Sequence, residues 1–204
     1  MTTPPTSTDA WREVGGVELS AILAGALDAF SELGYHGTTV RDIAGRVGVT
    51  VPALYYHHPN KEAILLALLN LATEDIGWRV EEAIAEAGDD VVLALGNIVE
   101  AVVIHMTHWL KLALLDTEAR YLSPQNRPAY ALPRRKIEAS VTAVIEHGVA
   151  MGVFTTPEPR EASRALLGML QWITRWYRPD GALSQADVSA KYTALARDLV
   201  GTVR

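Results

Sequence analysis

The sequence predicts an all-α protein of about nine helices: an N-terminal three-helix domain, then a larger helical domain. Apolar residues recur at helical spacing in almost every segment, and glycine, proline and capping residues separate these segments. The composition, 49% hydrophobic and 21% charged over 204 residues, is typical of a globular chain of one or two domains. No cysteine is present, which excludes disulfides, thiolate metal sites and cysteine nucleophiles.

Residues 1–16 are rich in proline, threonine and glycine, and we expect a flexible tail there. They lack the charged-then-apolar pattern of a signal peptide, so we expect a cytoplasmic protein. A first helix is predicted over 17–34, where apolar residues share one face, and Gly34 and Gly37 provide its stop signals.

Three further helices follow closely. Thr39, with an acidic residue three positions later, predicts the start of a second, short helix that ends at Gly48. Thr50 caps a third helix, with Pro52 tolerated in its first turn. Asn60 caps a fourth, which we expect to continue to about residue 87.

The remaining chain predicts longer helices over 91–115, 128–150, about 160–177 and 185–202. The 91–115 segment is apolar enough to suggest a membrane span. It also carries Asn97, Glu100 and Lys111, which are costly in hydrocarbon, so it predicts a buried helix of a soluble protein. We divide the chain into a tail at 1–16, a first domain at 17–65 and a second domain at 66–204.

The second and third helices, joined by a turn at Gly48, match the helix-turn-helix plan, in which the second helix enters the major groove of DNA. Leu54 is expected to anchor that helix, which leaves Val51 and Ala53 able to contact thymine methyl groups.

The run Gly34–Leu65, GYHGTTVRDIAGRVGVTVPALYYHHPNKEAIL, resembles the DNA-binding domain of TetR-family transcriptional regulators. The resemblance departs at Val51, a position often basic in the family, and at His58, which is usually aromatic. Together with the geometry above, it implies DNA contacts by the following residues: Thr39, Arg41, Thr50, Val51, Ala53, Tyr55, Tyr56 and Lys61.

The charge of this region is unusual for a DNA-binding domain. Residues 1–64 contain four basic and seven acidic residues, a formal charge of −3, and the whole chain carries −6. Non-specific attraction to DNA should therefore be weak, and we expect a shallow dependence of binding on salt.

The second domain predicts a small-molecule site, because aromatic side chains with a few polar groups typically line such pockets. A packed core with hydrogen-bonded polar tips is the alternative for each residue. The candidate ligand-binding residues are His105, His108, Trp109, Trp172, Arg175 and Trp176, with Trp172 and Trp176 expected to stack one turn apart. His105 and His108 lack a third ligand nearby, so no metal site is predicted, and no cofactor motif is present.

Two apolar stripes near the C-terminus predict a dimer interface of two helices per subunit, with intramolecular core as the alternative. The candidate interface residues are Leu166, Met169, Leu170, Ile173, Val188, Tyr192, Leu195 and Leu199. The run TRWYRPDGALSQADVSAKY (174–192) resembles TetR-type repressors of fatty-acid and steroid catabolism. That resemblance implies an acyl-CoA, or another bulky apolar acid, as effector.

These features predict a homodimeric repressor that a small-molecule effector releases from a palindromic DNA operator. The alternative is a ligand-binding helical protein with a weak or vestigial DNA-binding head. No nucleophile elbow, phosphate loop, dinucleotide glycine pattern or zinc-protease motif is present, so we do not expect an enzyme, and we expect no membrane partner.

Overall fold

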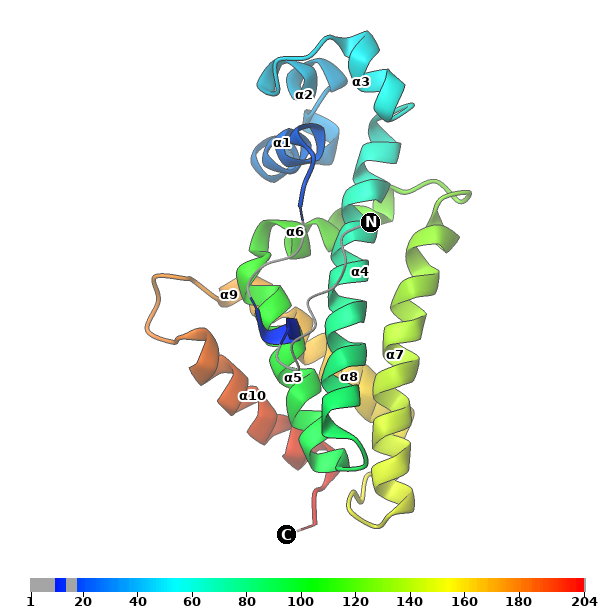
Figure 1. Cartoon of the computed structure of the whole chain (residues 1–204), viewed down its shortest axis with the longest axis vertical. Coiled ribbons are helices and arrows are strands. Elements are labelled where there is room, and N and C mark those ends of the chain that lie inside the picture. The colour runs from blue at the N-terminus through cyan, green and yellow to red at the C-terminus, as the bar shows by residue number, and fades with distance from the viewer. Residues whose placement is uncertain (1–9, 14–17, 204) are drawn as a thin grey trace. The chain divides into compact units, whose positions relative to one another are not determined.

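A computed structural model describes residues 10–13 and 18–203, and every regular element within them is helical, which confirms the all-α prediction (Figure 1). The elements are η1 (Ala10–Arg12), α1 (Ala21–Gly37), α2 (Val40–Arg46), α3 (Val51–His57), α4 (Lys61–Ala87), α5 (Val91–His108), α6 (Leu110–Leu114), η2 (Leu115–Tyr121), α7 (Arg127–Ala150), α8 (Pro159–Gln171), α9 (Ile173–Trp176) and α10 (Gln185–Val200).

Two compact units make up the chain. We call Gly16–Asp75 with Leu110–Pro133 the head, and Met1–Gly15, Ile76–Trp109 and Arg134–Arg204 the body. Helices α4 and α7 contribute residues to both units, because each division falls within a helix. The domain division predicted from the sequence, between residues 65 and 66, stays a prediction.

Local capping determines where the first three helices of the head begin. Ser20 caps α1, and Thr50 accepts a hydrogen bond from the first turn of α3. Thr39 and Asp42 form a complete capping box at α2, as the sequence predicts. The expected start of α1 at Val17 lies outside the described residues.

The head also contains a segment distant in sequence, α6 with η2. Tyr121 of η2 stacks on Tyr35 of α1, with ring centroids 5.8 Å apart. Lys111 of α6 forms an ion pair of 2.7 Å with Asp28 of α1. The α1 helix therefore packs against α2 on one side and against α6 and η2 on another.

Two predicted long helices are interrupted. The helix expected over 91–115 ends at His108, after the hydroxyl of Thr107 donates back to the carbonyl of Val103 at 2.8 Å, a bond that often bends helices. The helix expected to reach Tyr177 breaks at Trp172, which ends α8 and precedes the four-residue α9.

Helix α5 is the centre of the body and contacts α8, α9, α10 and η1. Its length and composition would suit a membrane span, but 72% of it is buried inside the chain. A helix that is apolar nearly all round needs such enclosure, so α5 has the burial of a core helix.

Part of the predicted flexible tail is ordered. Residues 1–9 and 14–16 lie outside the described residues, whereas Ala10–Arg12 form η1, and the Trp11 side chain is only 1% exposed. The structure differs here from the expectation because the Trp11 ring is buried and its Nε1 donates to Glu86 of α4.

Candidate functional site

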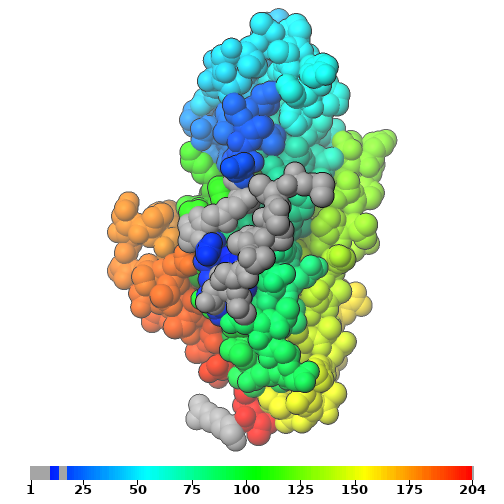
Figure 2. All heavy atoms as spheres, in the orientation of Figure 1, coloured from blue at the N-terminus to red at the C-terminus, as the bar shows by residue number. Residues whose placement is uncertain are grey.

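The recognition helix α3 presents its side chains as the helix-turn-helix plan requires. Leu54 is fully buried against the head, whereas Tyr55 and Tyr56 are 45% and 87% exposed. Thr50 and Ala53 are exposed and Val51 is half-buried, so the predicted face is open at the surface (cyan in Figure 2). The exposure of Tyr56 leaves its ring and its hydroxyl accessible to a binding partner.

The start of α2 supplies a second group of predicted DNA contacts. Arg41 is exposed. The Thr39 hydroxyl donates to Asp42 Oδ2 at 2.7 Å and accepts from the Asp42 backbone N–H at 3.2 Å. The hydroxyl of Thr39, and its backbone N–H, which donates to the same oxygen at 2.8 Å, hold the pKa of Asp42 below its ordinary value. The carboxylate therefore stays ionised and keeps the first turn of α2 rigid.

Lys61 has an intramolecular role that sequence reasoning missed. Its Nζ donates to the backbone carbonyls of Tyr35 at 2.7 Å and Thr38 at 2.8 Å, and it lies 4.3 Å from the centre of the Tyr35 ring. Partial burial lowers its pKa. The ammonium thus joins the start of α4 to the end of α1, with at most one donor left for a DNA phosphate.

The basic side chain of Arg46 is also engaged within the head, since its Nη2 lies 2.6 Å from Glu32 Oε2. The head consequently offers DNA fewer cations than its six lysine and arginine residues suggest. Neutral hydrogen bonds and backbone N–H groups have to supply much of any DNA contact.

The predicted ligand-binding residues differ in burial and in their partners, and their role in binding stays a prediction. His105 is buried, His108 is exposed and packs edge-on against Trp109, and Arg175 is exposed. Trp172 is 64% exposed. Trp176 stacks on Tyr192 of α10 at 6.2 Å, which takes the place of the expected stacking on Trp172. The helix breaks at Trp172, so the two tryptophans do not lie on one continuous helix.

A cavity of about 380 Å³ lies elsewhere in the body, between α4, α5 and α7. Its lining residues are Glu81, Ile84, Gly88, Val91, Ala94, Ser140, Ala143, Val144 and His147. Apolar walls with one acid, one hydroxyl and one imidazole are suited to a small organic ligand. None of these residues stood out in the sequence, because they come from three separate helices.

The predicted dimer residues divide into two sets. Leu166, Leu170, Ile173 and Val188 are fully buried within one chain, which is the burial expected of the alternative, intramolecular core. Leu195 and Leu199 are 49% and 38% exposed, while Met169 and Tyr192 are half-buried. With Trp172, these outer residues of α8 and α10 leave apolar surface that one chain does not cover.

Within the described residues, no three histidine, aspartate or glutamate side chains converge as a metal site would require.

Two families match the chain. The family described as bacterial regulatory proteins, tetR family, matches residues 22–68. The family described as tetracyclin repressor-like, C-terminal domain, matches residues 93–200, more than half of the 204 residues.

Individual proteins agree with this assignment. The HTH-type transcriptional repressor KstR2 of Rhodococcus jostii is 26% identical over 200 residues, 97% of each chain. The crystal structure of the TetR-family regulator PfmR from Thermus thermophilus has a TM-score of 0.80 at 30% identity, covering 91% of this chain and all of PfmR.

AibR, which was solved in complex with isovaleryl coenzyme A and operator DNA, shares the fold. Its TM-score is 0.79 at 23% identity, and the match covers 90% of this chain and 98% of AibR. The helix-turn-helix head, the helical body and both family matches lead to one conclusion: this chain belongs to the TetR family of transcriptional regulators.

Proposed function

We propose that this regulator is a homodimeric repressor that leaves a palindromic operator when a small-molecule effector binds the body. The observation that carries the proposal is the exposed face of α3, where Tyr56 is 87% and Tyr55 45% exposed above a fully buried Leu54. In a dimer, two such helices would enter successive major grooves about 34–36 Å apart.

The proposed subunit interface is the outer surface of α8 and α10, which includes Trp172, Leu195 and Leu199. Their exposure in one chain supports a partner, because apolar side chains clustered on two adjacent helices favour burial in a four-helix interface.

The proposed effector is an acyl-CoA or another bulky apolar acid, as the resemblance over 174–192 implies. AibR has the same fold and was solved in complex with isovaleryl coenzyme A and operator DNA. This complex supports the proposal that a protein of this fold can bind both an acyl-CoA and DNA. The cavity lined by Glu81, Ser140 and His147 is the proposed location for the apolar part of the effector.

Selection of random duplex DNA by the purified protein tests the proposal. We expect an enriched palindrome whose half-sites are about one helical turn apart. Tyr55→Ala and Tyr56→Ala should each weaken binding to that duplex by about tenfold, from the loss of a hydroxyl and ring contact at the recognition helix.

Leu132→Ala is the matched control, because Leu132 is also an exposed apolar side chain, at 70%, but lies on α7. A folded protein that enriches no sequence, both as purified and after refolding without ligand, would favour the alternative of a vestigial head. Unchanged affinity of both tyrosine variants would refute the role of α3.

A further inference from the structure

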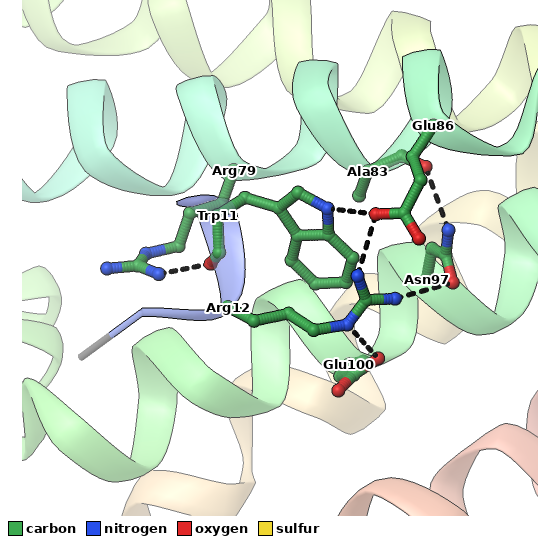
Figure 3. A network of polar contacts seen from close by, with 7 residues as sticks. All are labelled: Trp11, Arg12, Arg79, Ala83, Glu86, Asn97 and Glu100. Atoms are coloured by element: carbon green, nitrogen blue, oxygen red, sulfur yellow. Dashed lines mark hydrogen bonds and ion pairs between the residues drawn. The ribbon is translucent and has the colours of Figure 1, made fainter. Parts of the chain in front are cut away.

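A short segment that precedes the head in sequence, Ala10–Glu13, is fixed to the body by α4 and α5 (Figure 3). We call it the anchor. Trp11 Nε1 donates to Glu86 Oε2 at 2.6 Å, and Arg12 Nη1 donates to the same oxygen at 2.7 Å. Arg12 Nε also pairs with Glu100 Oε2 at 3.3 Å, and its guanidinium lies 3.9 Å from the centre of the Trp11 ring.

Asn97 of α5 connects all three elements of this network. Its Oδ1 accepts from Arg12 Nη2 at 3.4 Å, and its Nδ2 donates to the backbone carbonyl of Ala83 on α4 at 3.1 Å. Hydrogen bonds from Arg12 and Trp11 lower the pKa of Glu86, which keeps its carboxylate ionised at neutral pH. The anchor therefore contacts both helices through charged, mutually dependent bonds.

A buried cation supports the same segment from α4. Arg79 is 0% exposed, and its Nη1 donates to the backbone carbonyls of Trp11 and, at 3.1 Å, Glu13. A buried guanidinium needs hydrogen-bond acceptors, and loss of these two would be unfavourable. The anchor thus supplies backbone carbonyls that accept hydrogen bonds from the buried Arg79.

The anchor is joined to the head by a short stretch of chain. Residues 14–20 separate Glu13 from Ala21, the first residue of α1, so their Cα atoms can be no more than about 28 Å apart even if that stretch is fully extended. The start of α1 is consequently tied to the body by a covalent connection additional to the three others that join the two units, at residues 75–76, 109–110 and 133–134.

The anchor and the cavity occupy different faces of the same helix pair. On α4, the anchor-facing positions are 79, 83 and 86, and the cavity-facing positions are 81 and 84, with Gly88 directly after the helix. At about 3.6 residues per turn these two sets lie on nearly opposite sides of the helix. On α5, Asn97 and Glu100 face the anchor, whereas Val91 and Ala94 line the cavity.

We propose that the anchor is a further restraint through which the α4–α5 pair of the body limits the freedom of the start of α1 and raises operator affinity. Part of this inference, the effect on DNA, rests on the proposed function. The physical reason is preorganisation: with its start tied to the body, α1 loses less conformational freedom on binding DNA than it would with that end untied. A ligand that displaces α4 from α5 would disturb Glu86, Asn97 and Glu100, and hence the anchor.

Hydrogen exchange of the free, full-length protein tests the restraint without DNA. The variants are Trp11→Ala, Arg12→Ala and the milder Glu100→Ala, which removes only the 3.3 Å pair. We expect the amides of Leu23 and Ala24, which donate to the Ser20 hydroxyl and the Ser20 carbonyl, to exchange about tenfold faster in Arg12→Ala, with protection in α10 unchanged. Arg164→Ala is the matched control, because Arg164 also pairs with two carboxylates, at 2.9 and 2.6 Å, but joins α7 and α8.

Affinity for the duplex that the wild-type protein selects tests the consequence for DNA. Arg12→Ala and Trp11→Ala should bind it at least about fivefold more weakly, and the control should not. The double variant Arg12→Ala, Glu86→Ala should weaken binding by less than the two single effects combined, because the Arg12–Glu86 pair is lost in either single variant.

The outcomes separate this inference from the proposed function. If no duplex is enriched, the proposed function fails, and exchange at α1 still decides whether the restraint exists. If a duplex is enriched but folded anchor variants keep wild-type exchange at α1, or keep wild-type affinity, the inference is overturned. If Trp11→Ala does not fold, Glu100→Ala is used in its place. We expect it to speed exchange at α1 and to weaken duplex binding by smaller amounts than Arg12→Ala, and no change in either would overturn the inference.

Discussion

A single methyl group added at Gly25 should disturb the packing of α2 on α1 in the head. A Cβ at Gly25 would lie 2.3 Å from Val47 Cγ1, whereas carbon atoms pack about 3.5–4.0 Å apart, so more than about 1 Å must be relieved. Val47 is β-branched and stiff at χ1, and it ends α2 through its backbone bond to Ile43. The strain should therefore move the end of α2 and the turn before the recognition helix.

Two opposing terms determine the size of the effect of Gly25→Ala. Alanine improves helix propensity over glycine by about 1 kcal/mol. Overpacking costs about 1–3 kcal/mol, and we take the upper part of that range because the contact is so short. The net expectation is a loss of about 1 kcal/mol, seen as a fall in Tm of about 2–4 °C for a chain of this size.

Thermal denaturation followed by circular dichroism measures this, with two comparisons. Gly45→Ala is the control, since nothing lies within 4 Å of a Cβ there, and it should gain stability from helix propensity alone. In a Val47→Ala background, which removes the clashing methyl, Gly25→Ala should become neutral or stabilising. Stabilisation by Gly25→Ala in the wild-type background, equal to that of Gly45→Ala, would refute the reasoning.

Three further predictions concern DNA, assembly and pH. Because Lys61 and Arg46 are engaged within the head, the slope of log K against log salt for the selected duplex should be only about −2 to −4; a slope near −10 would contradict this. Trp172→Glu should convert the proposed dimer to monomer in sedimentation equilibrium, whereas Met151→Glu, at 52% exposure on a different surface turn, should leave assembly unchanged. The Ser123 backbone N–H and the Asn126 amide donate to Glu62 and hold its pKa below the ordinary value of 4.5. The ionised carboxylate therefore stabilises the loop that contains Ser123 and Asn126. This stabilisation is complete above pH 4.5 and is lost as the pH falls through the lowered pKa. Hydrogen exchange in the loop, corrected for intrinsic rates, should therefore accelerate in the wild type as the pH falls below 4.5 and through the lowered pKa. Glu62→Gln should exchange faster at neutral pH, with little further change on acidification.

Helix starts and the recognition helix could be predicted from the sequence because local interactions decide them. Thr39 and Thr50 bond to backbone groups three residues away, and the alternation of buried Leu54 with exposed Tyr55 and Tyr56 follows from helical periodicity. The TetR-family assignment rests on the same local pattern, since its motif lies within one continuous run of residues.

The tertiary structure decided which long-range partner each ambiguous side chain takes. Lys61 bonds to carbonyls 23 and 26 residues away, and Trp11 bonds to Glu86, 75 residues away, pairings that no local pattern encodes. Leu166 and Trp172 belong to one apolar stretch, yet one is fully buried and the other 64% exposed. The physical reason is that caps and periodicity depend on neighbours in sequence, whereas burial and ion pairing depend on which distant surfaces the folded chain brings together.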